Sequence, residues 1–350
     1  KLQIMAQEGS VDFNEIRNAY VHSLLKGASR PNSLGVAQVT INFLRKVVVQ
    51  EKYENIEDLL QVLRLHLSHA VRDCPSEPVI RNVFLIVMKL AREENTRALY
   101  GVDKEVGNPY DSLNTLWKKD EDLGNVTAAG KKMRKGLIAA VKEVMSELET
   151  ARDCILGRVS DVVQLNDTVI TYGLSSSPTL RLFLDTARKT TKMRQVLSVS
   201  SSTDDVQIPD FASALSLRDV ASVMPDVTKV VLGCVTVFPD GSCLVPSGVL
   251  SIAHLAYRHA VPLYVLVSFY KIAPYFSADA ATVVQSQGKV GLPVKYASSL
   301  RHRVILSPLF DILPANLVTL YISNNDAVLP SHMYRLISDY YHPQDLTESV

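Results

Sequence analysis

The stretch Lys229–Ser268 constrains the fold of this chain more than any other part of the sequence. It opens on the β-branched apolar run Val230–Leu232, passes through a turn at Pro239–Gly241, continues as a periodic apolar segment from near Pro246, and closes on a second apolar run. Two short apolar runs around a helix-length segment predict a βαβ unit, whose parallel strands are buried on both faces. Ligands of such domains bind beyond the carboxyl ends of the strands, so the loop after Val231 is the first place to expect a site.

Composition places the chain among ordinary globular proteins. Its 350 residues favour two domains, and its formal net charge of +1 supplies no general attraction to nucleic acid or anionic membrane. No apolar run approaches the ~18 residues of a membrane span, and we expect a cytoplasmic protein. The four cysteines form no CxxC pair, and we expect them to be reduced thiols that mostly fill the core: Cys74, Cys154, Cys234 and Cys243.

The period of the apolar residues changes near Asn166. Residues 1–160 show helical periodicity and predict an all-helical domain, whereas residues 161–350 alternate strand-like and helix-like segments. The sequence therefore predicts an α/β protein, in which a helical amino-terminal domain precedes a Rossmann-like domain with a mostly parallel sheet. One predicted strand, Val206–Ile208, follows the strand Gln195–Val199 too closely for a parallel crossover. Either this run is not the neighbouring parallel strand, or the sequence lacks residues after Ser200.

A hydroxyl-rich loop follows the predicted strand Asp167–Tyr172. Its candidate ligand groups are Thr171, Ser175, Ser176 and Ser177, directly before Pro178. Free amide groups at a helix start attract anions, which would make this loop a phosphate site. Serine before proline is also the common way to begin a helix, with Ser177 as the N-cap. The residues alone favour the capping interpretation and leave anion binding open.

Other candidate groups point to little chemistry. His66 and His69 have a spacing that can hold a metal, but no third ligand is suitably spaced, so we expect no metal and no cofactor. Asp311 is either a structural carboxylate that caps a nearby loop or a ligand contact. The chain contains no GxSxG, P-loop or GxGxxG motif.

Five segments of the chain carry a family resemblance: Pro75–Glu94, the turn GCVTVFPDGS, Pro262–Pro274, Leu309–Asn324 and Tyr334–Asp345. Together they resemble the regulatory subunits of eukaryotic translation initiation factor 2B, and the first and last of them are most similar to its beta-type members. The resemblance implies a helical domain followed by a Rossmann-like domain. It also implies a non-catalytic subunit of the guanine-nucleotide exchange factor for initiation factor 2.

That family is related to isomerases that act on methylthioribose 1-phosphate and ribose 1,5-bisphosphate. By resemblance, their catalytic cysteine falls at Gly173 of this sequence and their catalytic aspartate at Val235. Neither residue can exchange a proton, so the resemblance implies that acid-base isomerisation is lost. The alternative function is a sugar-phosphate isomerase, or a degenerate relative that still binds a sugar phosphate or a nucleotide.

The resemblance also implies the partners. They are homologous alpha and delta regulatory subunits, catalytic gamma and epsilon subunits, and the alpha subunit of initiation factor 2, whose phosphorylation this chain would help to sense. The isolated chain could form a homodimer. We predict a subunit contact formed by the segments 164–168 and 322–329, with these residues at the interface: Gln164, Asn166, Ile322, Asn324, Asn325 and Leu329.

Overall fold

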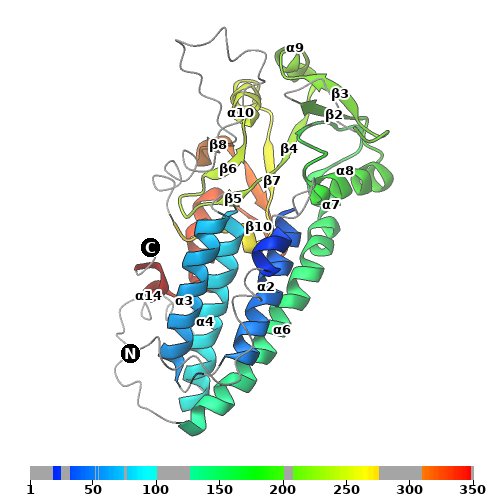
Figure 1. Cartoon of the computed structure of the whole chain (residues 1–350). Helices are drawn as coiled ribbons and strands as arrows, with labels where there is room; N and C mark the ends of the chain where they lie inside the picture. Colours follow the sequence, from blue (N-terminus) through cyan, green and yellow to red (C-terminus); the bar gives the residue numbers. More distant parts are fainter. Residues whose placement is uncertain are drawn as a thin grey trace, which may run out of the picture. The chain divides into compact units, whose positions relative to one another are not determined.

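The computed structural model describes residues 19–24, 32–51, 53, 55–74, 77–100, 127–200, 208–275 and 310–347 (Figure 1). The chain divides into two compact units. One comprises Lys1–Glu149 together with Ser338–Val350, and the other comprises Thr150–Ile337. The predicted domains, residues 1–160 and 161–350, stay a prediction.

The first unit is helical. In it, α4 packs against both α2 and α3. The apolar stripes of these helices form the core, because residues three and four apart share a helix face. Fully buried examples are Leu44, Leu59, Leu63 and Phe84. The helices are α2 (Ser33–Gln50), α3 (Ile56–Asp73), α4 (Pro78–Tyr100), α6 (Thr127–Gly157), which continues into the second unit, and α14 (Pro343–Thr347).

Side-chain caps fix the helix ends of this unit. The Asn32 side chain accepts a hydrogen bond from the Gly35 amide, at 2.8 Å, and Asn55 accepts one from the Asp58 amide, at 2.9 Å. At the carboxyl end of α2, the Arg134 guanidinium donates to the Val49 and Glu51 carbonyls. These contacts satisfy backbone groups that a helix leaves unpaired at its ends.

The second unit is built on a mostly parallel sheet. Within the described residues, seven strands lie in the order β10-β9-β7-β4-β1-β2-β3, and the edge strand β10 alone is antiparallel to its neighbour. The strands are β1 (Thr168–Tyr172), β2 (Gln195–Ser200), β3 (Ser213–Ser216), β4 (Lys229–Gly233), β7 (Leu263–Leu266), β9 (Leu320–Ile322) and β10 (Ala327–Val328). The chain runs outward from β1 in both directions, which is the doubly wound order. The predicted α/β fold is confirmed.

Helices surround this sheet (Figure 1). One face of it packs on α7 and α8 in a continuous apolar core, which contains Val169, Val231 and Phe183. The helical elements of the unit are α7 (Val159–Val162), α8 (Pro178–Thr191), α9 (Val220–Val223), η1 (Met224–Asp226), α10 (Val249–Arg258), η2 (Phe269–Lys271), η3 (Ala315–Leu317), η4 (Pro330–His332) and α13 (Met333–Tyr340), which ends in the first unit.

The predicted βαβ unit is present, but it contains an insertion. Strands β4 and β7 are parallel neighbours, as predicted, and α10 lies between them in sequence. Between β4 and α10 the chain adds a hairpin of β5 (Thr236–Val237) and β6 (Cys243–Pro246). This hairpin forms a second, antiparallel sheet with β8 (Phe310–Leu313). The turn predicted at Pro239–Gly241 joins its two strands.

Two strands predicted from the sequence lie partly or wholly outside the described residues. Of Val206–Ile208 only Ile208 is described. The parallel neighbour of β2 is β3, Ser213–Ser216, which agrees with the alternative that Val206–Ile208 is not the neighbouring strand. The number of residues between the end of β2 at Ser200 and the start of β3 at Ser213 meets the minimum of ~10–12 residues that a parallel crossover requires. The predicted strand Val304–Leu306 lies outside the described residues.

Candidate functional site

The fold places the candidate site where β1 and β4 end side by side. The sheet extends from β1 through β2 to β3 on one side, and from β4 through β7 to β9 on the other. We call the end of the sheet where the parallel strands finish the carboxyl edge. Doubly wound domains bind their ligands at this edge. Three loops meet there, after β1, β4 and β7, and the start of α10 lies beside them. The side chains of these loops decide what the site can do.

The loop after β1 begins with Gly173 in the left-handed region, at φ +64°. The Ser176 hydroxyl donates to the Gly173 carbonyl at 2.8 Å, which closes the turn. Ser177 occupies the predicted N-cap position of α8, before Pro178, although its side chain makes no capping hydrogen bond. Ser175 and Ser176 are exposed, whereas the Thr171 hydroxyl is fully buried without a hydrogen-bond partner in the described part of the chain. The predicted anion loop therefore holds two exposed hydroxyls and one enclosed by protein.

The loop after β4 lies against that loop. A Cβ added to Gly233 would lie 3.1 Å from the Ser177 hydroxyl, so serine fills the space that glycine leaves. The next residue, Cys234, is buried, and its thiol donates to the Leu266 carbonyl at 3.6 Å. Burial raises the pKa of this thiol to about 11, against the opposing effect of the Lys271 ammonium. A thiol with such a pKa is protonated at neutral pH and is a poor nucleophile.

Val235 follows Cys234 in the loop after β4, and its contacts are structural. It packs on a small apolar cluster, formed by Phe238, Leu244 and Ala273, beside the second sheet. Its amide donates to the Leu244 carbonyl at 2.8 Å, which extends the hairpin. This residue is therefore part of the framework of the hairpin.

Two charged side chains described at the carboxyl edge, Lys271 and Asp311, form hydrogen bonds with backbone groups of the same chain. The Lys271 ammonium donates to the Cys234 carbonyl at 2.7 Å, which ties the loop after β7 to the loop after β4. The Asp311 carboxylate accepts a hydrogen bond from the Gly248 amide, at 2.8 Å, at the start of α10. A helix start is the natural place for an external anion, and here a carboxylate of the same chain contacts it. This contact matches the structural alternative for Asp311.

Tyr172 closes the same region from the end of β1. Its hydroxyl donates to the Ser247 carbonyl at 2.7 Å, and it lies within 3.2 Å of the position that a Cβ on Gly248 would take. Gly248 has a φ of +100°, which only glycine adopts readily. Tyrosine, serine, lysine and aspartate side chains thus hold the loops to one another at the place where an enzyme of this fold would expose them.

The amino edge of the sheet, where the parallel strands begin, carries a network that the sequence did not reveal. Asp167, just before β1, accepts hydrogen bonds from the Gln164 amide at 2.6 Å and the Thr228 hydroxyl at 2.9 Å, and it pairs with Lys229 at 2.8 Å. Burial raises the pKa of this carboxyl, but these partners outweigh burial and hold the pKa below its ordinary value. Asp167 and Lys229 are 62 positions apart, so their pairing depends on the sheet order.

Of the six residues of the predicted subunit contact, four are exposed and two are buried. Gln164 and Asn166 are exposed at the amino edge, before the central strand β1. Ile322 and Asn324 are buried, Ile322 in the core and Asn324 with its side chain accepting from the Phe269 amide at 3.1 Å. The remaining two residues, Asn325 and Leu329, are exposed.

The two segments belong to different strands but have neighbours in common. Strand β10, which precedes Leu329, is four strands away from β1 in the sheet order, or roughly 19 Å at ordinary strand spacing. Ile322, however, packs in one apolar core with Val163, and Arg158, six residues before Gln164, donates to the Asn325 carbonyl. The contact itself stays a prediction.

No metal site or membrane span is present in the described parts of the two units. His66 is buried and its ring lies edge-on against Phe43, with centroids 5.4 Å apart. No group of three or more possible metal-ligating side chains occurs among the residues described. Among the helices that were described, none is long and apolar enough to cross a bilayer.

Fold and site together define a class: a helical unit joined to a doubly wound α/β unit whose carboxyl edge is held closed by its own side chains. Residues 216–330 match the Initiation factor 2 subunit family. The predicted resemblance to regulatory subunits of initiation factor 2B is confirmed by this match and by the relatives described next, which include beta-type members.

The similar proteins include beta subunits. The chain is 24% identical to translation initiation factor eIF2B subunit beta of Schizosaccharomyces pombe, over 92% of this chain and 94% of that one. Its fold is similar to the crystal structure of eIF2B beta from Chaetomium thermophilum, with a TM-score of 0.70 and 20% identity over 97% of this chain and 94% of that one. It is equally similar, with a TM-score of 0.70 and 21% identity over 94% and 95%, to a chain of the tetrameric eIF2B-beta2-delta2 complex of C. thermophilum.

Proposed function

We propose that this chain is a non-catalytic, beta-type regulatory and scaffold subunit of the guanine-nucleotide exchange factor for translation initiation factor 2. One observation carries the proposal: three titratable groups among the described residues of the carboxyl edge are engaged within the protein. Lys271 binds a carbonyl, Asp311 binds an amide, and Cys234 is buried with a raised pKa. The similarity to beta subunits over nearly the whole chain supports the same assignment.

The two positions that correspond to isomerase catalytic residues extend this proposal. Gly173 forms a left-handed turn, and Val235 packs on an apolar cluster. Neither side chain can act as an acid or a base. The same fold therefore serves assembly and recognition in place of isomerisation.

Pairing with a homologous subunit is the next part of the proposal. The name of one similar structure, a beta2-delta2 tetramer, supports a delta-type partner. The proposal also includes the alpha, gamma and epsilon subunits, the alpha subunit of initiation factor 2 and a cytoplasmic location. Of the predicted contact residues, we propose that the exposed ones, Gln164, Asn166, Asn325 and Leu329, meet the partner, and that Ile322 and Asn324 support that surface from inside.

Native mass spectrometry tests the assignment. The chain is measured alone and after co-expression with a delta-type subunit, and we expect a stoichiometric complex that contains both chains. Charge substitution at Leu329, which is 47% exposed, should weaken that complex, whereas substitution of exposed Tyr257 on α10 serves as the control. Failure to form any complex with delta-type, gamma-type or epsilon-type subunits would contradict the proposal.

A further inference from the structure

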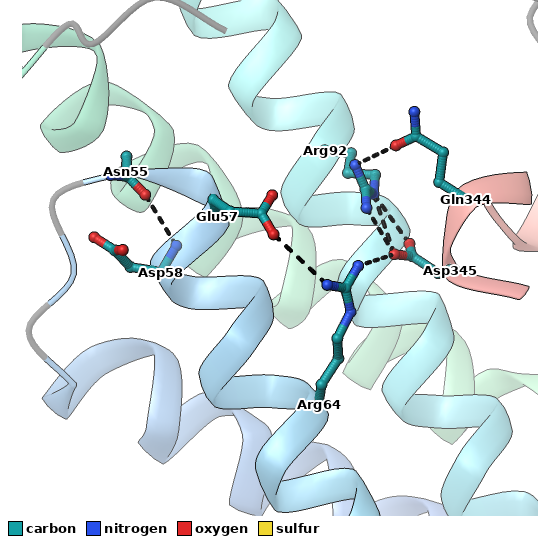
Figure 2. Close-up of polar contacts among 7 residues, drawn as sticks. All are labelled: Asn55, Glu57, Asp58, Arg64, Arg92, Gln344 and Asp345. Carbon is teal, nitrogen blue, oxygen red and sulfur yellow. Dashed lines mark hydrogen bonds and ion pairs between the residues drawn. The ribbon is translucent and has the colours of Figure 1, made fainter. Parts of the chain in front are cut away.

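A charged cluster in the helical unit holds the carboxyl-terminal segment of the chain. The chain leaves this unit after Glu149 and returns to it at Ser338, so its last helix is a separate piece of the unit. Figure 2 shows Arg64 of α3 and Arg92 of α4 pointing to the same carboxylate, that of Asp345 in α14. We call Ser338–Leu346 the strap.

The geometry around Asp345 is that of a carboxylate-binding site. The Arg92 guanidinium contacts both oxygens, with Nη2 at 2.8 Å from Oδ1 and Nε at 3.1 Å from Oδ2. Its Nη1 also donates to the Gln344 side chain at 2.7 Å, and Arg64 Nη2 lies 3.5 Å from Asp345 Oδ1. A planar guanidinium that contacts both oxygens of a carboxylate gives a strong and geometrically specific interaction.

Burial strengthens the contact between Asp345 of the strap and Arg92. The side chains of Asp345 and Arg92 are only 1% and 12% exposed, so their attraction is weakly screened by solvent. From residue 341 to 346 the buried residues are Tyr341 and Asp345, and the other four are half-buried. Helix α14 has five residues, which is too short for a stable helix by itself, so its structure depends on this docking.

Arg64 is the second cation at this carboxylate. It also pairs with Glu57 at 3.6 Å, a side chain that is 51% exposed and screened by water, whereas the Asp345 side chain is 1% exposed. Of these two carboxylates, the buried one of Asp345 gives the stronger interaction.

We propose that Arg64 and Arg92 form a carboxylate-binding site on the helical unit, and that the strap occupies this site through Asp345 as a separable segment. The strap can leave while α2, α3 and α4 stay folded, because those helices have an apolar core of their own. An acidic segment of another protein would have to displace the strap to reach the same two side chains.

Hydrogen exchange of the full-length chain, followed by mass spectrometry, tests this inference. In Asp345→Asn, we expect the amides of residues 341–346 to exchange at least about tenfold faster, as loss of a charge-assisted hydrogen bond implies, with α2 and α3 unchanged. Asp339→Asn is the matched control, because it removes the same charge from an exposed side chain of the strap, and it should exchange like the wild type.

A second variant tests the geometry of the site. Arg92→Lys keeps the positive charge and loses the two-pronged contact, so it should also accelerate exchange in the strap, but less than Asp345→Asn. Unchanged exchange in Asp345→Asn would overturn the proposal. Equal acceleration throughout α2, α3 and the strap would overturn it too, because the strap would then be inseparable from the unit.

Discussion

The two edges of the large sheet use their charged groups differently. At the amino edge, Asp167 and Lys229 form a buried ion pair that joins the beginnings of β1 and β4. At the carboxyl edge, where the same two strands end, Lys271 and Asp311 contact backbone groups and not each other. Enzymes of this architecture bind their ligands at the carboxyl edge. In this chain Lys271 and Asp311 instead hold loops of that edge together, which fits the proposed non-catalytic subunit.

The largest effect is expected at the amino edge. Asp167→Asn leaves the Lys229 ammonium buried without its partner, which costs about 3 kcal/mol for a pair of this kind. Urea denaturation should therefore give a lower free energy of unfolding by that amount. Asp161→Asn, at an exposed position before β1, is the control and should change stability by no more than about 0.5 kcal/mol. Equal results for the two variants would show that the buried pair contributes nothing.

The same pair predicts a pH dependence. The pKa of Asp167 is lower in the folded protein than the ordinary value of 3.8, so its contribution is fully present above about pH 4. It is lost as pH falls through the folded pKa, because the carboxyl then takes up a proton. The difference in unfolding free energy between wild type and Asp167→Asn should therefore be constant from pH 7 to pH 5 and should shrink below pH 4. A difference that grows on acidification would contradict the sign of this linkage.

A smaller effect is expected at the carboxyl edge. Tyr172→Phe removes the hydroxyl that donates to the Ser247 carbonyl, which should cost about 1 kcal/mol in unfolding free energy. Tyr257→Phe, on a side chain that is 67% exposed, provides the control and should be neutral. If Tyr172→Phe is neutral as well, the tyrosine does not hold the loops of the carboxyl edge together.

Part of this comparison could be predicted from the sequence. Apolar runs such as Val230–Leu232 and the serine before Pro178 gave the parallel strands and the start of α8, because these signals lie within a few residues of one another. The second sheet could not be predicted, since β6 pairs with Phe310–Leu313, more than 60 residues later. For the same reason, Asp311 was identified as a candidate, but its partner Gly248 was not. The Asp167–Lys229 pair was missed because each residue alone resembles a solvated charge at the end of a strand.

The most direct measurement of the central claim is an isomerase assay of the purified chain and of the variant Gly173→Cys with Val235→Asp. Methylthioribose 1-phosphate and ribose 1,5-bisphosphate are supplied, and the sugar carbons are followed by NMR. We predict no turnover by the wild-type chain. We also predict none by the variant, because Tyr172, Ser177 and Asp311 still hold the carboxyl edge closed. Turnover of either sugar phosphate by the wild-type chain would contradict the account, and turnover by the variant alone would show that this edge is open to a substrate.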